Sequence, residues 1–70
     1  YSKEELVAEM GAAFLNAHAG IETEHEQSAA YIAGWLKALK NDKKLVMQAA
    51  SAAQKAADFI MGVAFETETA

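Results

Sequence analysis

The sequence predicts an all-α fold, a three-helix unit with short connections. The chain of 70 residues contains no Pro, so no residue breaks a helix interior by lacking an amide proton. Alanine, the strongest helix former, is abundant, whereas β-branched residues are few and scattered. In three stretches apolar residues recur at spacings of three and four, and each stretch follows a residue type that caps helices. These observations favour helices and give no reason to expect a strand.

The first helix is expected from about residue 3 to residue 19. Ser2 and Glu5 match the S-x-x-E capping box, in which each side chain accepts a hydrogen bond from the other residue's backbone amide. Gly20 is expected to end the helix in the left-handed conformation that glycine adopts without strain. The expected apolar face consists of Leu6, Met10, Ala13, Phe14 and Ala17.

The second helix is expected from about residue 24 to residue 40. Thr23 and Glu26 repeat the capping pattern at its start. Lys37 and Lys40 fall in the last turn, where positive charge interacts favourably with the helix dipole. The expected apolar face consists of Ala29, Ile32, Trp35, Leu36 and Leu39.

The third helix is expected to begin after Asn41 or Asp42, which are both good capping residues, and to end near residue 64. The small residues in its middle would let another helix approach closely. We expect residues 65–70, which are polar, to form a frayed tail. The expected apolar side consists of Leu45, Ala49, Ala52, Ala56, Phe59, Ile60 and Val63.

Composition excludes several classes of protein. The apolar fraction of 53% argues against disorder, and the absence of Cys excludes disulfides and thiolate metal sites. No apolar run approaches the roughly 20 residues of a membrane span, and no secretion leader is evident, so we expect no membrane partner and a cytoplasmic location. The net charge of -4 disfavours a dedicated nucleic-acid binder but leaves room for a local basic patch. Because the chain begins with Tyr1 and not with Met, we expect it to be a piece of a longer parent protein.

His25 and Glu26 begin like the zinc-peptidase motif H-E-x-x-H, in which two His one helical turn apart bind the metal. The second His would stand at position 29, which is Ala29. Since the motif physically requires both imidazoles, we interpret this stretch as the start of the second helix and not as a metal site.

Glu5 and Glu9 lie one helical turn apart, on the side of the first helix that also carries Ala12 and Asn16. Two carboxylates at this spacing repel each other by a few tenths of a kcal/mol, and a bound cation would remove that cost. The alternative is that Glu5 only caps the helix and Glu9 is solvated, because acidic residues are favourable in the first turns of any helix. Residue types alone leave both interpretations open.

Three stretches resemble a known family: "EELVAEMGAAFL", "AYIAGWLKALKNDK" and "QAASAAQKAADFI". They are similar to the end of the zincin-like metallopeptidase domain of ArdC-type antirestriction proteins. Related domains occur beside primases of conjugative plasmids and in polyvalent phage proteins. The resemblance covers about residues 1–62, and in that family a helix with H-E-x-x-H lies upstream of an E-E-L-x-A-E helix.

The resemblance implies that Glu5 is the third zinc ligand and that Glu9 orients a histidine that binds the metal. Glu4 is the second choice of ligand, because only Glu5 has a carboxylate four residues on. A catalytic zinc needs three protein ligands and an open position, and this chain has no H-E-x-x-H. We therefore expect residues 1–64 to be the carboxy-terminal, three-helix part of a larger domain. It would be inactive alone, with zinc bound only in the intact parent and the upstream H-E-x-x-H segment as its partner.

Two other features allow different functions. Four lysines, Lys37, Lys40, Lys43 and Lys44, cluster between the second and third helices and could contact single-stranded DNA, or could simply be solvated. The apolar stripes could instead serve a non-catalytic helical interaction module, with self-association through an exposed apolar face. His18 does not complete a metal site with Glu5, because it lies roughly 20 Å away along the same helix.

Overall fold

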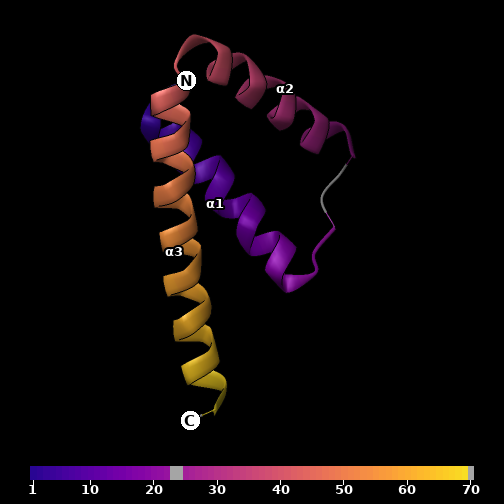
Figure 1. Ribbon diagram of the computed structural model, residues 1–70. Coiled ribbons are helices and arrows are strands. Elements are labelled where there is room, and N and C mark those ends of the chain that lie inside the picture. Colours follow the sequence, from indigo (N-terminus) through magenta and orange to yellow (C-terminus); the bar gives the residue numbers. More distant parts are fainter. Residues whose placement is uncertain (23–24, 70) are drawn as a thin grey trace.

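The computed structural model describes residues 1–22 and 25–69, and all of its regular secondary structure is helical. This confirms the expected all-α fold of three helices with short connections. Thr23, the expected cap of the second helix, lies outside the described residues. The helices are α1 (Lys3–Ala19), α2 (His25–Asn41) and α3 (Lys43–Thr69), shown in Figure 1.

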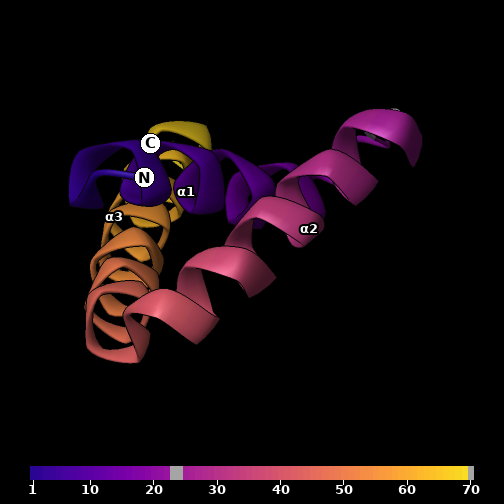
Figure 2. The ribbon, with the colours of Figure 1, turned by 90° about the horizontal axis from the view of Figure 1, so that it is seen from above.

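The three helices form a flat arrangement with extents of 45 × 26 × 12 Å. The main packing contact is between α1 and α3, which cross in the first half of α3 (Figure 1). A single residue, Asp42, joins α2 to α3. From this junction α2 diverges, so that its first turns lie far from α3, as the view from above shows (Figure 2). Its packing on α3 is therefore confined to its carboxy-terminal half.

Both ends of α1 are closed as the sequence predicts. Glu5 N donates to Ser2 Oγ at 3.2 Å, and Ser2 N donates to Glu5 Oε1 at 3.4 Å, which completes the capping box. At the other end Gly20 has φ 71°, in the left-handed region. Gly20 N and Ile21 N donate to two carbonyls of the last turn at 3.3 and 2.9 Å, the pattern of a Schellman motif.

Two glycine-to-alanine substitutions are expected to change stability in opposite directions. Gly20→Ala forces a Cβ into the left-handed region and should lower the free energy of unfolding by about 1–2 kcal/mol. Gly62 lies inside α3, and no atom is within 4 Å of a Cβ added there. Gly62→Ala should therefore raise the free energy of unfolding by about 0.5–1 kcal/mol. Urea unfolding followed by circular dichroism measures both, and a shift of the same sign in the two variants would contradict the assignment of Gly20 as the cap.

The core lies where α1 crosses α3. Leu6 and Met10 of α1 are buried against Val46, Ala49 and Ala53 of α3. Two of the three contributions from α3 are alanines with no exposed surface, which lets the backbones of the two helices come close. The close approach expected from the small middle of the third helix is thus present.

The buried side of α3 differs from the expected one. The residues with little or no exposure are Val46, Ala49, Ala53 and Ala57, whereas the expected Ala56, Ile60 and Val63 are exposed and Phe59 is 73% exposed. The physical reason is that the contact with α1 follows a row of small residues on one side of α3, and the carboxy-terminal end of α3 projects beyond α1 in Figure 1. The bulky residues of the expected stripe are left without a neighbouring helix among the described residues.

The expected apolar face of α2 is also partly wrong. Ile32 and Leu36 are 53% and 55% exposed, while Trp35, Ala38 and Leu39 pack against the core. Apolar periodicity identifies the side of α2 that carries the most apolar residues. The orientation of α2 after Asp42 decides which side packs against the other helices. This side is rotated from the expected one toward Trp35 and Ala38.

The start of α3 follows the sequence and its end does not. Asp42 Oδ1 accepts a hydrogen bond from Leu45 N at 3.0 Å, so Asp42 and not Asn41 is the cap. The helix was expected to end near residue 64, yet it continues to Thr69. No Gly or Pro stands between residues 65 and 69 to stop it. None of the helices in the described part of the chain is both long and apolar enough to cross a membrane.

Candidate metal centre

Glu5 lies in the first turn of α1 and its side chain is exposed. Its Oε1 atom accepts the long 3.4 Å hydrogen bond from Ser2 N. The capping role that the sequence allowed is therefore present. Because a carboxylate has about four acceptor positions, this single bond does not use up its capacity to bind a cation.

Glu9 is half-buried and is held from two directions. Its Oε1 atom accepts a hydrogen bond from Tyr1 Oη at 2.6 Å and another from Trp35 Nε1 at 3.0 Å. The donors lie 8 residues before it and 26 residues after it in the chain. The expectation that Glu9 is simply solvated does not describe this environment, because the carboxylate is tied to both the amino-terminal residue and α2.

The contact with Glu9 changes the acidity of Tyr1. The hydrogen bond that its hydroxyl donates to Glu9, together with partial desolvation and the negative charges of Glu9 and Glu5, raises the pKa of Tyr1 from 10.0 to about 12. Each of these causes favours the neutral phenol over the phenolate. Tyr1 therefore remains a hydrogen-bond donor throughout the neutral and mildly alkaline range.

This pKa predicts a loss of stability at high pH. The folded pKa of Tyr1 lies above the unfolded value, so the contribution to stability is fully present below pH 10 and is lost as the pH rises through about 12. We expect the unfolding midpoint in urea to fall over this interval more steeply for the native sequence than for Tyr1→Phe, which cannot titrate. The Glu9→Gln variant should bring the pKa of Tyr1, measured by phenolate absorbance, back toward 10.0. Identical pH profiles for the native sequence and Tyr1→Phe would argue against the contact.

An aromatic pair on α2 supports the Trp35 side of this contact. The rings of Tyr31 and Trp35 are stacked, with centroids 6.0 Å apart and planes 4° from parallel. Gln27 Nε2 donates to Tyr31 Oη at 2.9 Å, one turn earlier on the same helix. Gly34 lies against the ring of Tyr1, and a Cβ at that position would come within 2.9 Å of Tyr1 Oη. The absence of a side chain at Gly34 therefore makes room for the contact between Tyr1 and Glu9.

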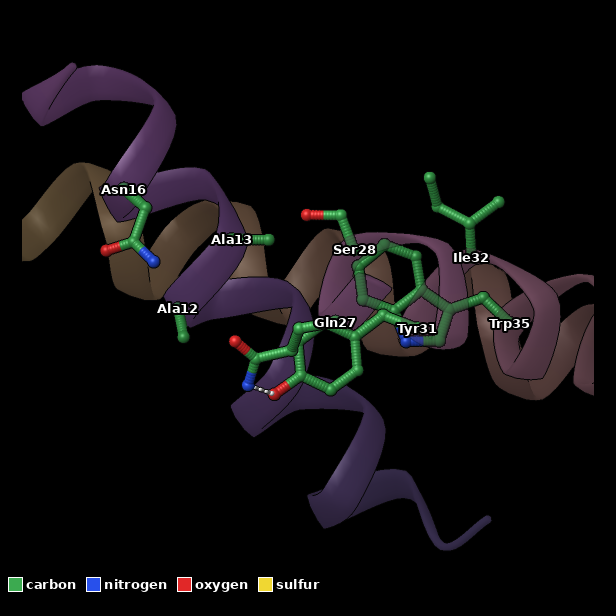
Figure 3. A pocket seen from close by; sticks show the side chains of 8 residues that line it. All are labelled: Ala12, Ala13, Asn16, Gln27, Ser28, Tyr31, Ile32 and Trp35. Carbon is green, nitrogen blue, oxygen red and sulfur yellow. Dashed lines mark hydrogen bonds between the residues drawn. The ribbon is translucent and has the colours of Figure 1, made fainter. Parts of the chain in front are cut away.

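A cavity of about 340 Å³ lies between α1 and α2 next to this pair. Figure 3 shows α2 contributing the aromatic rings and α1 contributing small and polar side chains. Its volume is at the lower end of the range for small-molecule sites. Ala12 and Asn16 are on the side of α1 that carries Glu5 and Glu9, but neither carboxylate is among the residues that line the cavity. The cavity is lined by Ala12, Ala13, Asn16, Gln27, Ser28, Tyr31, Ile32 and Trp35.

His18 lies far from Glu5, at the other end of α1. His18 is exposed in the last turn of α1, as expected for a residue that interacts with the helix dipole. His25 is the first residue of α2, and its side chain lies outside the described part of the structure. Glu26 is in the first turn of α2 and Ala29 is one turn further on, so this helix start offers no second imidazole.

The four lysines surround the junction of α2 and α3. Lys37 and Lys40 are exposed near the end of α2, and Lys43 and Lys44 are exposed at the start of α3. The carboxylate of Asp42, between the two pairs, is occupied by the cap of α3. The lysine side chains are thus available to a phosphate or to solvent.

The residues near Glu5 and Glu9 provide only part of a zinc site. Among the side chains that the structure describes, no three of the ligating types lie close enough together to hold a metal ion. Glu5 has an accessible carboxylate of a type that zinc accepts, and Glu9 is already held by two donors, as is usual for an acid that orients another ligand. By donor type the two carboxylates suit one metal ligand and one orienting acid, and the described side chains do not form a complete zinc site.

The sequence did not predict that Tyr1 and Trp35 donate hydrogen bonds to Glu9, or that Tyr31 stacks on Trp35. Trp35 was assigned only to the apolar face of the second helix. The available signal was the indole N–H, since a partly buried Trp usually finds a hydrogen-bond partner. Nothing in the sequence indicated that the partner would be Glu9.

Comparison with known proteins gives a consistent result. The DNA primase TraC of Escherichia coli is 42% identical over 66 residues, and a second DNA primase TraC from the same species is 39% identical over 66 residues. The uncharacterized protein y4eC of Sinorhizobium fredii is 38% identical over 61 residues. These alignments cover 94%, 94% and 86% of this chain but only 6%, 4% and 20% of the respective relatives. No solved structure is significantly similar to the chain.

The relatives named as primases agree with the association expected from the resemblance. Residues 1–52, which include α1, α2 and the start of α3, match the family described as zincin-like metallopeptidase. The matched segment contains Glu5, Glu9 and Trp35. The chain therefore belongs to the zincin-like metallopeptidase family.

Proposed function

We propose that this chain is the carboxy-terminal helical portion of a zinc metallopeptidase-like domain in a longer, cytoplasmic parent protein of a mobile element. The observation that carries the proposal is the family match over residues 1–52. This segment contains Glu5 and Glu9, which are one helical turn apart on α1. Resistance to host restriction, as in ArdC-type proteins, is the biological role that the resemblance supports. A cytoplasmic location suits a protein related to DNA primases.

In this proposal Glu5 supplies the third zinc ligand, and an upstream H-E-x-x-H segment supplies two histidines and the general base. Glu9 accepts the ring N–H of one of these histidines and so holds the imidazole in the tautomer that binds metal. Bound zinc would activate a water molecule for attack on a peptide carbonyl. The 70-residue chain has neither the histidine pair nor the base, so we expect it to cleave no peptide alone.

Substitution of single carboxylates in the parent tests the assignment. We expect Glu5→Gln to weaken zinc binding by more than about 100-fold, since loss of a ligand should exceed the roughly 10–100-fold effect of an orienting group. Glu4→Gln is the matched control, because it removes the same charge from the neighbouring exposed position. Competition with a chelator measures the affinity. Loss of zinc in Glu4→Gln and not in Glu5→Gln would transfer the role to Glu4, and a parent without bound zinc would exclude the metallopeptidase proposal.

A second candidate function is contact with single-stranded DNA through the parent. It is favoured by the four exposed lysines at the junction of α2 and α3 and by the similarity to proteins named as primases. If all four lysines contact phosphates, the logarithm of the binding constant should fall with the logarithm of salt concentration with a slope of about −3. Replacing Lys43 and Lys44 by alanine should reduce that slope by about half. Lys55→Ala, an exposed lysine elsewhere on α3, should leave it unchanged.

A third candidate is a helical interaction module without chemistry. The exposed apolar residues on the second half of α3, Phe59, Ile60 and Val63, favour it. Such a surface would show itself as concentration-dependent self-association of the chain, detected by sedimentation and reduced in Phe59→Ser. Self-association that disappears when the parent's upstream segment is present would instead mark these residues as an internal surface of the larger domain.

A further inference from the structure

The two hydrogen bonds to Glu9 fall on the same oxygen atom. Tyr1 Oη and Trp35 Nε1 both donate to Oε1, at 2.6 and 3.0 Å. Neither of these two hydrogen bonds uses the second oxygen, Oε2. A carboxylate that is anchored through one oxygen has less freedom to rotate, so the direction in which the other oxygen points is restricted.

The donor on α2 is itself held in place. Trp35 is half-buried against the core, and its indole stacks on the ring of Tyr31. The indole N–H can only donate, so unlike a hydroxyl it cannot turn around and accept a proton from Glu9. The pair therefore presents a rigid donor at a fixed place beside α1.

From this arrangement we infer that Trp35 and Tyr1 are positioning residues that hold Glu9 for its role toward a zinc-bound histidine. The inference rests on the proposed function, because it assigns a task to residues around the same acid. It also assigns a function to α2. This helix makes few contacts with α3, but it presents Trp35 to Glu9 on the acidic side of α1. Neither Trp35 nor Tyr1 would touch the metal.

The test uses the parent protein and compares three variants that keep an aromatic ring. Trp35→Phe and Tyr1→Phe each remove one donor to Glu9, and we expect each to weaken zinc binding by about tenfold, within the range for groups that orient a ligand. Tyr31→Phe is the matched control, because it removes a hydroxyl that bonds to Gln27 and not to Glu9. This control should change the affinity by less than about twofold, as expected for a substitution outside the contact.

A double-mutant cycle separates positioning from general stability. In a Glu9→Gln background, Trp35→Phe should weaken zinc binding no further, because its effect passes through the carboxylate. An equal loss in both backgrounds, or equal losses in Trp35→Phe and Tyr31→Phe, would overturn the positioning role while leaving the proposed function intact. A loss of zinc affinity in Tyr1→Phe is not explained by misfolding, because Tyr1 is 50% exposed and its ring contributes little to the core.

A readout independent of zinc completes the test. In the parent the indole N–H resonance of Trp35 is assigned by its loss in Trp35→Phe, and it then reports the contact with Glu9. We expect this resonance to shift in Glu9→Gln and to stay in place in Tyr31→Phe. An unchanged indole resonance in Glu9→Gln would remove the structural basis of the inference, whereas a shifted resonance in a parent that binds no zinc would reject the proposed function and with it the positioning task.

Discussion

Replacing Leu6 by alanine is expected to remove about half of the stability of the chain. Leu6 is the largest side chain with no exposed surface, and it lies at the crossing of α1 and α3. Loss of a buried Leu side chain costs about 2–5 kcal/mol, because the cavity left behind collapses only partly. A chain of 70 residues has a total stability of only about 4–10 kcal/mol. The urea midpoint, followed by circular dichroism, should therefore fall sharply.

The same chemical change on α2 provides the control. Leu36 is 55% exposed, so Leu36→Ala should lower the free energy of unfolding by about 0.5 kcal/mol or less. If the two variants lost equal stability, Leu36 and not only Leu6 would belong to the core, and the direction assigned to α2 would be wrong. A loss at Leu36 alone would point to a different packing of all three helices.

Replacing Ala53 by leucine is expected to have the second largest effect on stability. Ala53 has no exposed surface and lies in the row of small residues on α3 that faces α1. Three extra carbon atoms at this place must push the two helices apart, which typically costs about 1–3 kcal/mol. Thermal unfolding of the variant should begin at a lower temperature than that of the native sequence.

Ala56→Leu is the matched control for this overpacking. Ala56 is exposed on the same helix, and the sequence alone had placed it on the packed side. Since leucine is nearly as good a helix former as alanine, this variant should keep the native stability within about 0.5 kcal/mol. The opposite result, a stable Ala53→Leu and a destabilised Ala56→Leu, would restore the stripe expected from the sequence.

The sequence predicts the acidic side of α1, but it does not predict the hydrogen bonds from Tyr1 and Trp35 that hold Glu9. Glu5 and Glu9 are one helical turn apart, so their common side follows from helix geometry alone. The capping box of Glu5 also follows from four adjacent residues. In contrast, the bond from Trp35 to Glu9 joins residues 26 positions apart, and its existence depends on how two helices are placed relative to each other.

The packed sides of the helices show the same limit. The apolar residues of α3 outnumber the places in its contact with α1, so periodicity allows more than one face to be buried. Small residues occupy the contact, because Ala49 and Ala53 let α1 approach. Phe59 is 73% exposed although it is only two residues from the buried Ala57, because it points to another side of the helix. Hydrophobicity summed over a helix does not contain that information, since it does not say how far the neighbouring helix extends.

The sequence by itself determined that there are three helices and where most of them begin and end. These signals act within about four residues, as the caps at Ser2, Gly20 and Asp42 show. Only the tertiary structure decided which faces are buried and that Trp35 meets Glu9. The physical reason is the one-residue junction at Asp42: the direction in which α2 leaves it depends on packing between distant segments, which no local pattern encodes.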